Sequence, residues 1–498
     1  MISLLALRNL TYRPWRSLLL FLGYGMGVAV MITLLSIGEA LVTQARQEKL
    51  VGGGDITVLP EGLDVEVMKT GGLGGLFFSI DRSRFIYRQV LASPRLAGAV
   101  RAVSPQIDGK LLYLRARDGR VTPVRAVGEI PSATRAVGAL PAIAAGAWRD
   151  DDGDRRYVAP TRHELYDEID HFHVTPPGVA HPESWAEWHY FNVLSPSGKA
   201  WTFISYIVAG DVRGSRWGGK LGVTVRDSTG AIRRYALLVA AARVAFSTTH
   251  ADVRLGDASV IVRDDGSYAI EGAAHREQGS GPPLTIHLVV TPAPRAYFPG
   301  ASLGSEDLVS GYVVAGLRAS ASGTICEGTR CERYDGAQSY HDHNWGVWQG
   351  VTWDWGASRV GAYTILYGRV IPPASVAETP PLFVYLVDSL GFRAVFRPRD
   401  IRYTDGRTIT VDGRSVRVPS VAEFADVRGD DTLRVRLEIE SALGTDTRKG
   451  VAQRGGAGAA ASDARPYFIQ MKGTATLAGR VGGAPIGGKG TGFFETYR

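Results

Sequence analysis

Residues 340–346, Tyr-His-Asp-His-Asn-Trp-Gly, gather acid/base-capable side chains in one short run, and Trp348, Trp353 and Trp355 follow within ten residues. A carboxyl group and two imidazoles among large aromatic rings indicate a polar spot on an apolar wall, where acid/base chemistry or ligand capture can occur. Three chemistries fit such a run: metal binding, nucleophilic catalysis and general acid catalysis.

Metal binding would use His341 and His343, which project to the same side of a strand. No histidine follows His343 in the chain, so further ligands would have to come from elsewhere, such as His189 or Glu187. A bare His-x-His pair is weakly specific for metal. Nucleophilic catalysis by Ser339 lacks the Gly-x-Ser-x-Gly turn that exposes such a serine. We therefore expect no metal and no cofactor.

General acid catalysis would use Asp342, which strand alternation places opposite both histidines and beside Tyr340 and Asn344. Burial among aromatic rings raises a carboxyl pKa, so the group stays protonated and can donate. Protonation of an alkene creates a cation, which indole faces stabilise by about 2 kcal/mol when desolvated. This combination suits hydration or cyclisation of an apolar polyene. The alternative is a structural hydrogen-bond network that joins two strands.

A second aromatic cluster occupies residues 187–191, Glu-Trp-His-Tyr-Phe, at the start of a strand. Alternation puts Glu187 and His189 on one face and Trp188 and Tyr190 on the other. The glutamate is either a buried, partnered carboxylate or the edge of a site. The candidate catalytic residues are Asp342, Tyr340 and Asn344. The candidate substrate-binding residues are His341, His343, Trp345, Trp348, Trp353, Trp355, Glu187, Trp188, His189 and Tyr190.

The elements that would position these residues are mainly β. Residues 433–440 alternate apolar and polar side chains, and Asp412-Gly413 marks a hairpin turn inside another alternating run. Turn signals recur every eight to twelve residues, which favours barrels or sandwiches over βαβ units. The charge-rich segment 149–156 is the clearest linker. About 340 residues follow it, and we expect two barrel-like halves, 157–322 and 323–498.

The N-terminal part of the 498-residue chain contains a charge-free run of 22 residues, 17–38, which is long enough to span a bilayer as a helix. Arginines precede it at positions 8, 13 and 16, so the positive-inside rule puts residues 1–16 in the cytoplasm and the rest outside. A cleaved signal peptide is the competing interpretation. We expect an uncleaved anchor followed by a small α+β extracytoplasmic segment over 39–148, with a helix near 83–92 and hairpin turns at Asp108-Gly109 and Asp118-Gly119.

The two cysteines and the net charge bear on the cellular compartment and on the kind of partner. Cys326 and Cys331 could be redox-active in a reducing compartment, but outside the cytoplasm they would form a disulfide that closes a small loop. The net charge of +7 is spread over the chain without a Lys/Arg block, so nucleic acid is not an expected partner.

Residues 1–145 resemble the start of ABC-exporter permeases of the macrolide-export and lipoprotein-release type. The likeness rests on Ala-Leu-Arg-Asn-Leu at 6–10, Leu-Ser-Ile-Gly-Glu-Ala-Leu at 35–41 and Gly-Asp-Ile-Thr-Val at 54–58. Such permeases have three further membrane helices, and no later apolar run here approaches bilayer length. The resemblance therefore implies an anchor and a small extracytoplasmic domain, with an ABC-transporter ATPase and permease as candidate partners.

Residues 157–498 resemble the hydroxyneurosporene synthase, or carotenoid 1,2-hydratase, family, which includes attachment-type lipocalin-like proteins. The motif at 340–346, Trp-Asp-Trp at 353–355, residues 166–172 and the closing residues 490–495 carry the likeness. It implies two lipocalin-like antiparallel β-barrels and makes Asp342 the proton donor. His189 departs from the family, which usually has tryptophan there. The family also contains members without established activity.

Together these features predict a single-pass bacterial inner-membrane protein with most of its chain in the periplasm. Its β-barrels would bind an apolar isoprenoid or lipid, and a hydro-lyase like carotenoid 1,2-hydratase, or a cyclase, is the expected enzyme class. Asp342 would lie on the wall of an apolar barrel. The alternative function is a non-catalytic accessory subunit of an ABC exporter that handles lipophilic cargo.

Overall fold

A computed structural model describes residues 12, 14–47, 55–56, 58, 80–91, 93–138, 150–214, 216–227, 229–305, 308–373, 380–448 and 465–498. The chain divides into two compact units. One contains Met1–Leu91 and Leu96–Arg155, and the other contains Ala92–Arg95 and Arg156–Arg498. The division at Arg155 falls within the expected linker 149–156, although Asp152–Val158 in that region forms a helix, α6.

The first unit begins with a long apolar helix, α2 (Pro14–Gln47), which contains the charge-free run. Its segment Pro14–Glu39 has a mean hydropathy of 2.3 and no buried part, so it is a candidate membrane span, although a signal sequence has the same properties. The other elements of this unit are α4 (Ile80–Leu91), β1 (Gln106–Arg115), β2 (Val121–Glu129) and α5 (Pro131–Ala136).

Strands β1 and β2 form an antiparallel hairpin. Asp118-Gly119 lies in its turn, where Gly119 adopts a φ of 85°, as the sequence predicted. Asp108-Gly109 is not a turn, because these residues lie inside β1 at a register shift between Ile107 and Lys110. An extra residue in an antiparallel ladder bends the strand without ending it.

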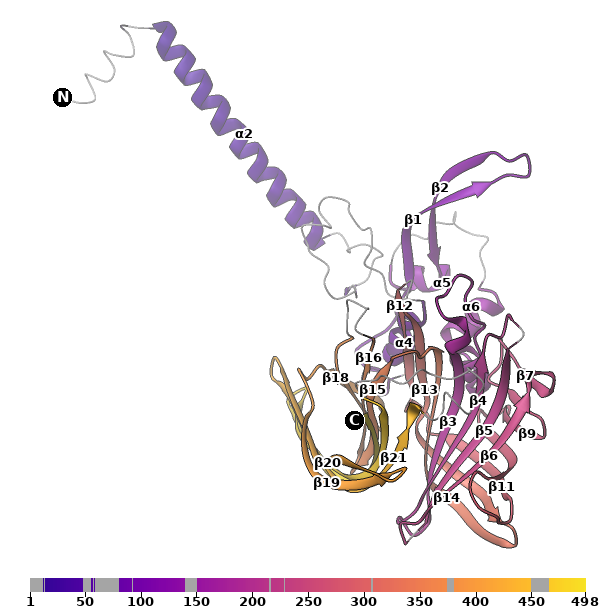
Figure 1. Cartoon of the computed structure of the whole chain (residues 1–498). Coiled ribbons are helices and arrows are strands. Elements are labelled where there is room, and N and C mark those ends of the chain that lie inside the picture. The colour runs from indigo at the N-terminus through magenta and orange to yellow at the C-terminus, as the bar shows by residue number, and fades with distance from the viewer. Residues whose placement is uncertain are drawn as a thin grey trace. The chain divides into compact units, whose positions relative to one another are not determined.

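The second unit contains a closed antiparallel barrel of 8 strands. Its strands pair in the order β10-β11-β13-β14-β3-β4-β5-β6, and β6 pairs with β10 to complete the circle. Strands β3, β4, β5 and β6 are seen side by side in Figure 1. The strands are β3 (Trp185–Leu194), β4 (Trp201–Gly210), β5 (Trp217–Arg226), β6 (Ile232–Ala240), β10 (Tyr268–Arg276), β11 (Leu284–Pro292), β13 (Leu308–Glu327) and β14 (Arg330–Val347).

Four short strands extend this sheet, namely β7 (Val244–Phe246), β8 (Val253–Leu255), β9 (Ala258–Val262) and β12 (Phe298–Ser305). Three short helical elements accompany it, namely α7 (Arg162–Asp170) and the 3-10 turns η1 (Pro182–Ser184) and η2 (Ala241–Arg243). Thr161 caps the start of α7 by accepting a hydrogen bond from the Glu164 backbone, while the Glu164 side chain accepts one from the Thr161 backbone. This capping box fixes where α7 begins.

The second sheet has 9 antiparallel strands in the order β18-β17-β16-β15-β23-β22-β21-β20-β19. They are β15 (Thr352–Val360), β16 (Tyr363–Ile371), β17 (Phe383–Asp388), β18 (Gly391–Phe396), β19 (Arg402–Val411), β20 (Arg414–Arg428), β21 (Asp431–Asp446), β22 (Tyr467–Val481) and β23 (Ala484–Tyr497). The sheet curves around one apolar core, yet no ladder joins its edges β18 and β19 among the described residues. Asp412 and Gly413, with φ of 47° and 79°, form the predicted turn between β19 and β20.

The expected boundary between the two halves at 322/323 needs correction. That position lies inside β13, and β14 as far as Val347 also belongs to the first barrel. The β13–β14 hairpin places Cys326 opposite Cys331, and a disulfide joins them. The change of sheet therefore comes after Val347, because the hairpin pairs with β3 and β11.

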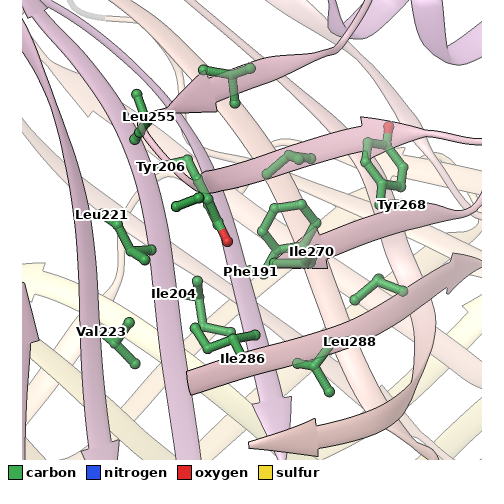
Figure 2. Packing of buried hydrophobic residues seen from close by; sticks show 14 of the residues in the cluster. Phe191, Ile204, Tyr206, Leu221, Val223, Leu255, Tyr268, Ile270, Ile286 and Leu288 are labelled. Atoms are coloured by element: carbon green, nitrogen blue, oxygen red, sulfur yellow. The ribbon is translucent and has the colours of Figure 1, made fainter. Parts of the chain in front are cut away.

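The interior of the first barrel is filled by side chains. Figure 2 shows residues from its walls, among them Phe191, Tyr206, Tyr268 and Ile286, packed into one apolar cluster. Each of these four side chains is fully buried. The inner faces of these strands thus form an apolar core of packed side chains.

Candidate functional site

The two faces of β14 carry different chemistry. Asp342 lies opposite Tyr190 of the neighbouring strand β3, and His343 lies opposite His189. His341 stacks on Phe191 with ring centroids 4.1 Å apart, so the histidines point into the first barrel. Tyr340 contacts Phe493 of β23 at 4.6 Å, so its face points toward the second sheet. Asp342 therefore lies on the outer wall of the barrel, not in its interior.

A glycine at the end of β14 helps to form this site. Gly346 has a φ of 143°, and a Cβ there would lie 2.4 Å from the Val309 carbonyl oxygen. The chain then turns over residues 348–351, where the Val351 amide donates to the Trp348 carbonyl at 3.3 Å. Strand β15 starts directly afterwards and returns Trp355 to the outer face of β14, where its indole Nε1 donates to the Tyr340 hydroxyl at 2.9 Å.

Asp342 is held by two neighbours on its own strand. The Tyr340 hydroxyl donates to Oδ2 and the Asn344 amide Nδ2 donates to Oδ1, both at 2.7 Å. The Asp342 side chain is only 4% exposed. Burial raises its pKa to about 6, although the hydrogen bonds from Tyr340 and Asn344 and the charge of His341 act in the opposite direction. With this pKa, about a tenth of the carboxyl group is protonated at pH 7 and about half at pH 6.

Aromatic rings surround this carboxyl group. Tyr340 lies edge-on to Tyr190 at 6.3 Å, and Trp355 lies edge-on to Tyr312 at 5.0 Å. Next to them, Trp188 lies 4.8 Å from Trp348, and Trp348 lies 5.7 Å from Trp353. Aromatic side chains of both sheets thus surround the region of the acid, an environment that suits apolar and cationic groups.

A second carboxyl group, Glu495 of β23, belongs to the same region. Its Oε2 accepts from the Trp353 indole at 3.0 Å, and its Oε1 accepts from the Gln470 amide at 3.2 Å. Burial raises the pKa of Glu495 to about 7, the negative charge of Asp342 adds to the rise, and the two hydrogen bonds oppose it. The site therefore contains two buried, electrostatically coupled carboxyl groups that titrate near neutral pH.

The inner face of β14 holds a separate cluster centred on Asp170, the last residue of α7. Asp170 Oδ2 accepts from the Tyr268 hydroxyl at 2.6 Å and lies 2.9 Å from His341 Nε2. Its Oδ1 lies 2.8 Å from His343 Nδ1. Glu187 lies 3.0 Å from His343 Nε2 and also accepts from the backbone of His173 at 2.8 Å.

Charges within this cluster stabilise one another. Burial opposes the charge on His343, but hydrogen bonds to Asp170 and Glu187 outweigh it and raise the His343 pKa to about 10. Burial likewise disfavours ionised Asp170, yet the histidines around it hold its pKa well below the usual value. Burial lowers the pKa of His189 and keeps that imidazole neutral. The cluster is thus a buried ion pair with additional hydrogen bonds.

Asp170, His189 and His341 also place one ligand atom each within 4.8 Å of one another, so they form a group that could hold a metal ion. The His189 Nε2 and His341 Nδ1 atoms lie within hydrogen-bond distance of the Ala251 and Tyr190 carbonyl oxygens. Each Asp170 oxygen already has a hydrogen-bond partner. His189 Nδ1, in contrast, has no hydrogen-bond partner among the described residues and lies 3.6 Å from Asp170 Oδ1.

The structure divides the residues predicted from the sequence into two groups. The outer group surrounds the carboxyl group of Asp342 and comprises Asp342, Tyr340, Asn344, Trp188, Tyr190, Trp348, Trp353 and Trp355. The inner group lies in the first barrel and comprises His341, His343, Trp345, Glu187 and His189. The inner group lies on the opposite side of the strands from Asp342.

Sequence reasoning missed three residues that complete these groups, Asp170, Glu495 and Phe493. Asp170 lies 171 positions from His341 in the chain, so spacing could not connect them. A signal for Glu495 was present, because Phe493 and Glu495 alternate with Phe494 at the end of a strand. Glu495 therefore shares a strand face with the aromatic Phe493, and a carboxyl group beside an aromatic ring on one face is the pattern that also marks Asp342.

Comparisons with known proteins give distant structural matches only. No family model matches the chain, and no curated protein matches it. A putative AttH from Nitrosomonas europaea has a TM-score of 0.44 and 15% identity, over 66% of this chain and 99% of that chain. Kievitone hydratase from Nectria haematococca has a TM-score of 0.39 and 15% identity, over 65% and 93%. CghA with Sch210972 has a TM-score of 0.44 and 13% identity, over 68% and 97%.

These values are too low for the matches to assign a family or an activity to this chain. None of them supports the permease resemblance of residues 1–145, which stays a prediction.

Proposed function

We propose that this protein adds a proton to a carbon–carbon double bond of an apolar, isoprenoid-like substrate and that water then adds to the cation. Asp342 is the proton donor. The observation that carries the proposal is a buried carboxyl group with a pKa raised to about 6, held by Tyr340 and Asn344 between aromatic faces of two sheets.

The electrostatics of the site support acid catalysis. A donor works best when its pKa lies near the working pH, and burial brings Asp342 into that range. After donation, the Asp342 carboxylate is stabilised by the hydrogen bonds from Tyr340 and Asn344. The substrate cation faces the rings of Trp355 and Tyr190, whose π-electrons attract positive charge by about 2 kcal/mol in a desolvated site.

A small cavity next to Tyr340 favours hydration over cyclisation. It has a volume of about 10 Å³, and Asn192, Trp201 and Thr364 contribute to its lining. A volume of about 10–15 Å³ holds one water molecule when polar partners are present. The Trp201 indole nitrogen and the Thr364 hydroxyl have no hydrogen-bond partner among the described residues. A water bound here would satisfy them and could attack the cation, returning its proton to the Asp342 carboxylate.

The apolar helix α2 fits the same proposal as a membrane anchor. An isoprenoid dissolves in a bilayer, and an anchored protein would meet it there. In this proposal the N-terminus lies in the cytoplasm and the barrels lie in the periplasm, as the arginines before the helix favour.

Replacement of the proton donor tests the proposal. Asp342→Asn removes the acidic proton but can still accept a hydrogen bond from Tyr340. We expect turnover of an added acyclic polyene to fall by about 10²–10⁴-fold, which is the usual contribution of general acid catalysis. Product formation is measured by chromatography and mass spectrometry, with incorporation of ¹⁸O from labelled water as the sign of hydration.

Asp257→Asn is the matched control, because the Asp257 side chain is fully exposed. The control should keep wild-type turnover. An Asp342→Asn variant that folds and retains wild-type turnover contradicts the assignment of the donor. Wild-type protein that consumes none of a panel of polyenes contradicts the proposed reaction itself.

A further inference from the structure

An arginine-lined pocket lies where the first barrel meets β15. Its volume is about 390 Å³, within the range of small-molecule sites. The lining residues are Arg162, Thr291, Pro292, Ala293, Pro294, Arg318, Ala319, Ser320 and Arg359. Three of them are arginines and none of them is acidic. We call this cavity the arginine pocket.

Backbone groups position the three arginines. Arg318 lies at an irregularity of the β13–β14 ladder, between Gly316 and Ala319, and its carbonyl accepts from the Ala293 amide at 2.7 Å. Arg162, at the start of α7, donates to the Pro292 carbonyl. Arg359 donates to the Ala319 carbonyl and, at 3.2 Å, to the Ser339 carbonyl. These three guanidinium contacts are all with neutral carbonyl groups.

The charge of Asp265 interacts with that of Arg162 at longer range, but the lining of the pocket contains no carboxylate. Among the described residues, no carboxylate lies within 4 Å of the guanidinium groups of Arg162, Arg318 or Arg359. Burial lowers the pKa of Arg359 to about 10, and repulsion from Arg318 adds to the effect. An anion in the pocket would relieve this repulsion. Guanidinium groups bind phosphate oxygens with paired, charge-assisted hydrogen bonds.

The arginine pocket is close to the proposed acid. Arg359 also lines the small cavity that Tyr340 and Phe493 line, and Tyr340 binds Asp342. Ser339, whose carbonyl binds Arg359, precedes Asp342 by three residues, or about 10 Å along an extended strand. The acid therefore lies about 10 Å along β14 from the strand position that binds Arg359.

We propose that the arginine pocket binds the phosphate or diphosphate head group of an amphiphilic isoprenoid whose apolar chain extends along β14 to Asp342. The inference rests on the proposed function and specifies its substrate class. Three arginines match a multiply charged phosphate group, whereas one carboxylate would leave two positive charges without a partner. The double bond that reacts would lie about 10 Å from the head group.

The test measures binding to the full-length protein in detergent by calorimetry, with geranylgeranyl diphosphate, geranylgeraniol, geranylgeranoic acid and inorganic pyrophosphate as probes. We expect the diphosphate to bind most tightly. Arg318→Gln should weaken its binding by about tenfold to a hundredfold, as expected for loss of a charge-assisted hydrogen bond. The affinity for geranylgeraniol should not change.

Two further variants make the result specific. Arg162→Gln removes an exposed pocket arginine and should weaken diphosphate binding without harming the fold. Arg295→Gln removes an exposed arginine near the pocket that does not line it and should leave binding unchanged. Equal loss in Arg295→Gln and Arg318→Gln would overturn the proposal.

The other probes give distinct outcomes. If geranylgeraniol and geranylgeranyl diphosphate bind with equal affinity, the pocket is not an anion site. If geranylgeranoic acid binds more tightly than the diphosphate, the ligand is a carboxylate and not a phosphate. If pyrophosphate binds as tightly as the lipid diphosphate, the pocket is a site for a free anion, and the proposal that its ligand is an amphiphile is overturned. Tight, arginine-dependent binding of a lipid that is never consumed upholds the pocket and contradicts only the proposed reaction.

Discussion

At the scale of single residues, the site depends on two carboxyl groups that burial keeps partly protonated. Asp342 and Glu495 have pKa values of about 6 and about 7, above their ordinary values of 3.8 and 4.5. For both groups the folded state favours the protonated form. Their contribution to the free energy of unfolding is therefore fully present below about pH 4 and is lost as the pH rises through about 6 to 7.

This linkage predicts a measurable pH dependence. A rise of two pKa units corresponds to about 3 kcal/mol, most of which is lost between about pH 4 and about pH 8. Urea unfolding of wild-type protein should show this decline, and Asp342→Asn, which cannot ionise, should show a smaller one. Because the Asp342 charge also raises the pKa of Glu495, the difference between the two proteins reports Asp342 together with its coupling to Glu495. Parallel curves for the two proteins would mean that the Asp342 pKa is not raised.

At the scale of secondary-structure elements, Asp170 joins α7 to three strands. Its carboxylate contacts His341 and His343 of β14 and Tyr268 of β10, and its Oδ1 lies 3.6 Å from His189 of β3. This contact holds the helix against the barrel beneath the outer face that carries Asp342. We therefore regard the inner cluster as support for the site.

Removal of the Asp170 charge tests this role. Asp170→Asn leaves the charged His343 buried with only Glu187 as a partner, and loss of one member of a buried ion pair costs about 3–5 kcal/mol. Chemical unfolding should show that loss, whereas Asp257→Asn on the surface should change stability by less than about 0.5 kcal/mol. If Asp170→Asn unfolds like the wild type, the cluster does not stabilise the barrel.

The same elements show what the sequence could predict. Strand alternation correctly placed Asp342 opposite His341, and the Asp412-Gly413 turn formed as expected, because both depend on neighbouring residues. Alternation gives the face of a residue but not the strand that pairs with it. The contacts of Asp170 with His341, and of Glu495 with Trp353, join residues 171 and 142 positions apart. The wrong boundary at 322 has the same cause, because pairing with β3 and β11 assigns β13 and β14 to the first barrel.

At the scale of the whole molecule, the open question for α2 is whether it stays attached to the barrel and the second sheet. Pro14–Glu39 fits both a permanent anchor and a signal sequence, and the two differ in the mass of the mature protein. If α2 is an anchor, the mature protein keeps residues 1–47 and stays in the membrane fraction after carbonate extraction. Placing lysine at Gly27 and Val30, near the centre of the apolar run, should release the protein, because each charge costs about 2.5–3.5 kcal/mol on insertion.

Lysine at Tyr12 and Trp15 is the matched control for that double substitution. These residues lie at the start of the helix, where a basic residue can reach the membrane surface and even favours the cytoplasmic orientation. The control protein should stay in the membrane fraction. Since an isoprenoid substrate resides in the bilayer, the Gly27→Lys/Val30→Lys protein should also lose access to membrane-embedded substrate while it still turns over substrate in detergent. A wild-type chain that lacks its first forty or so residues after secretion would show instead that α2 is a signal sequence and that the barrels reach their substrate without an anchor.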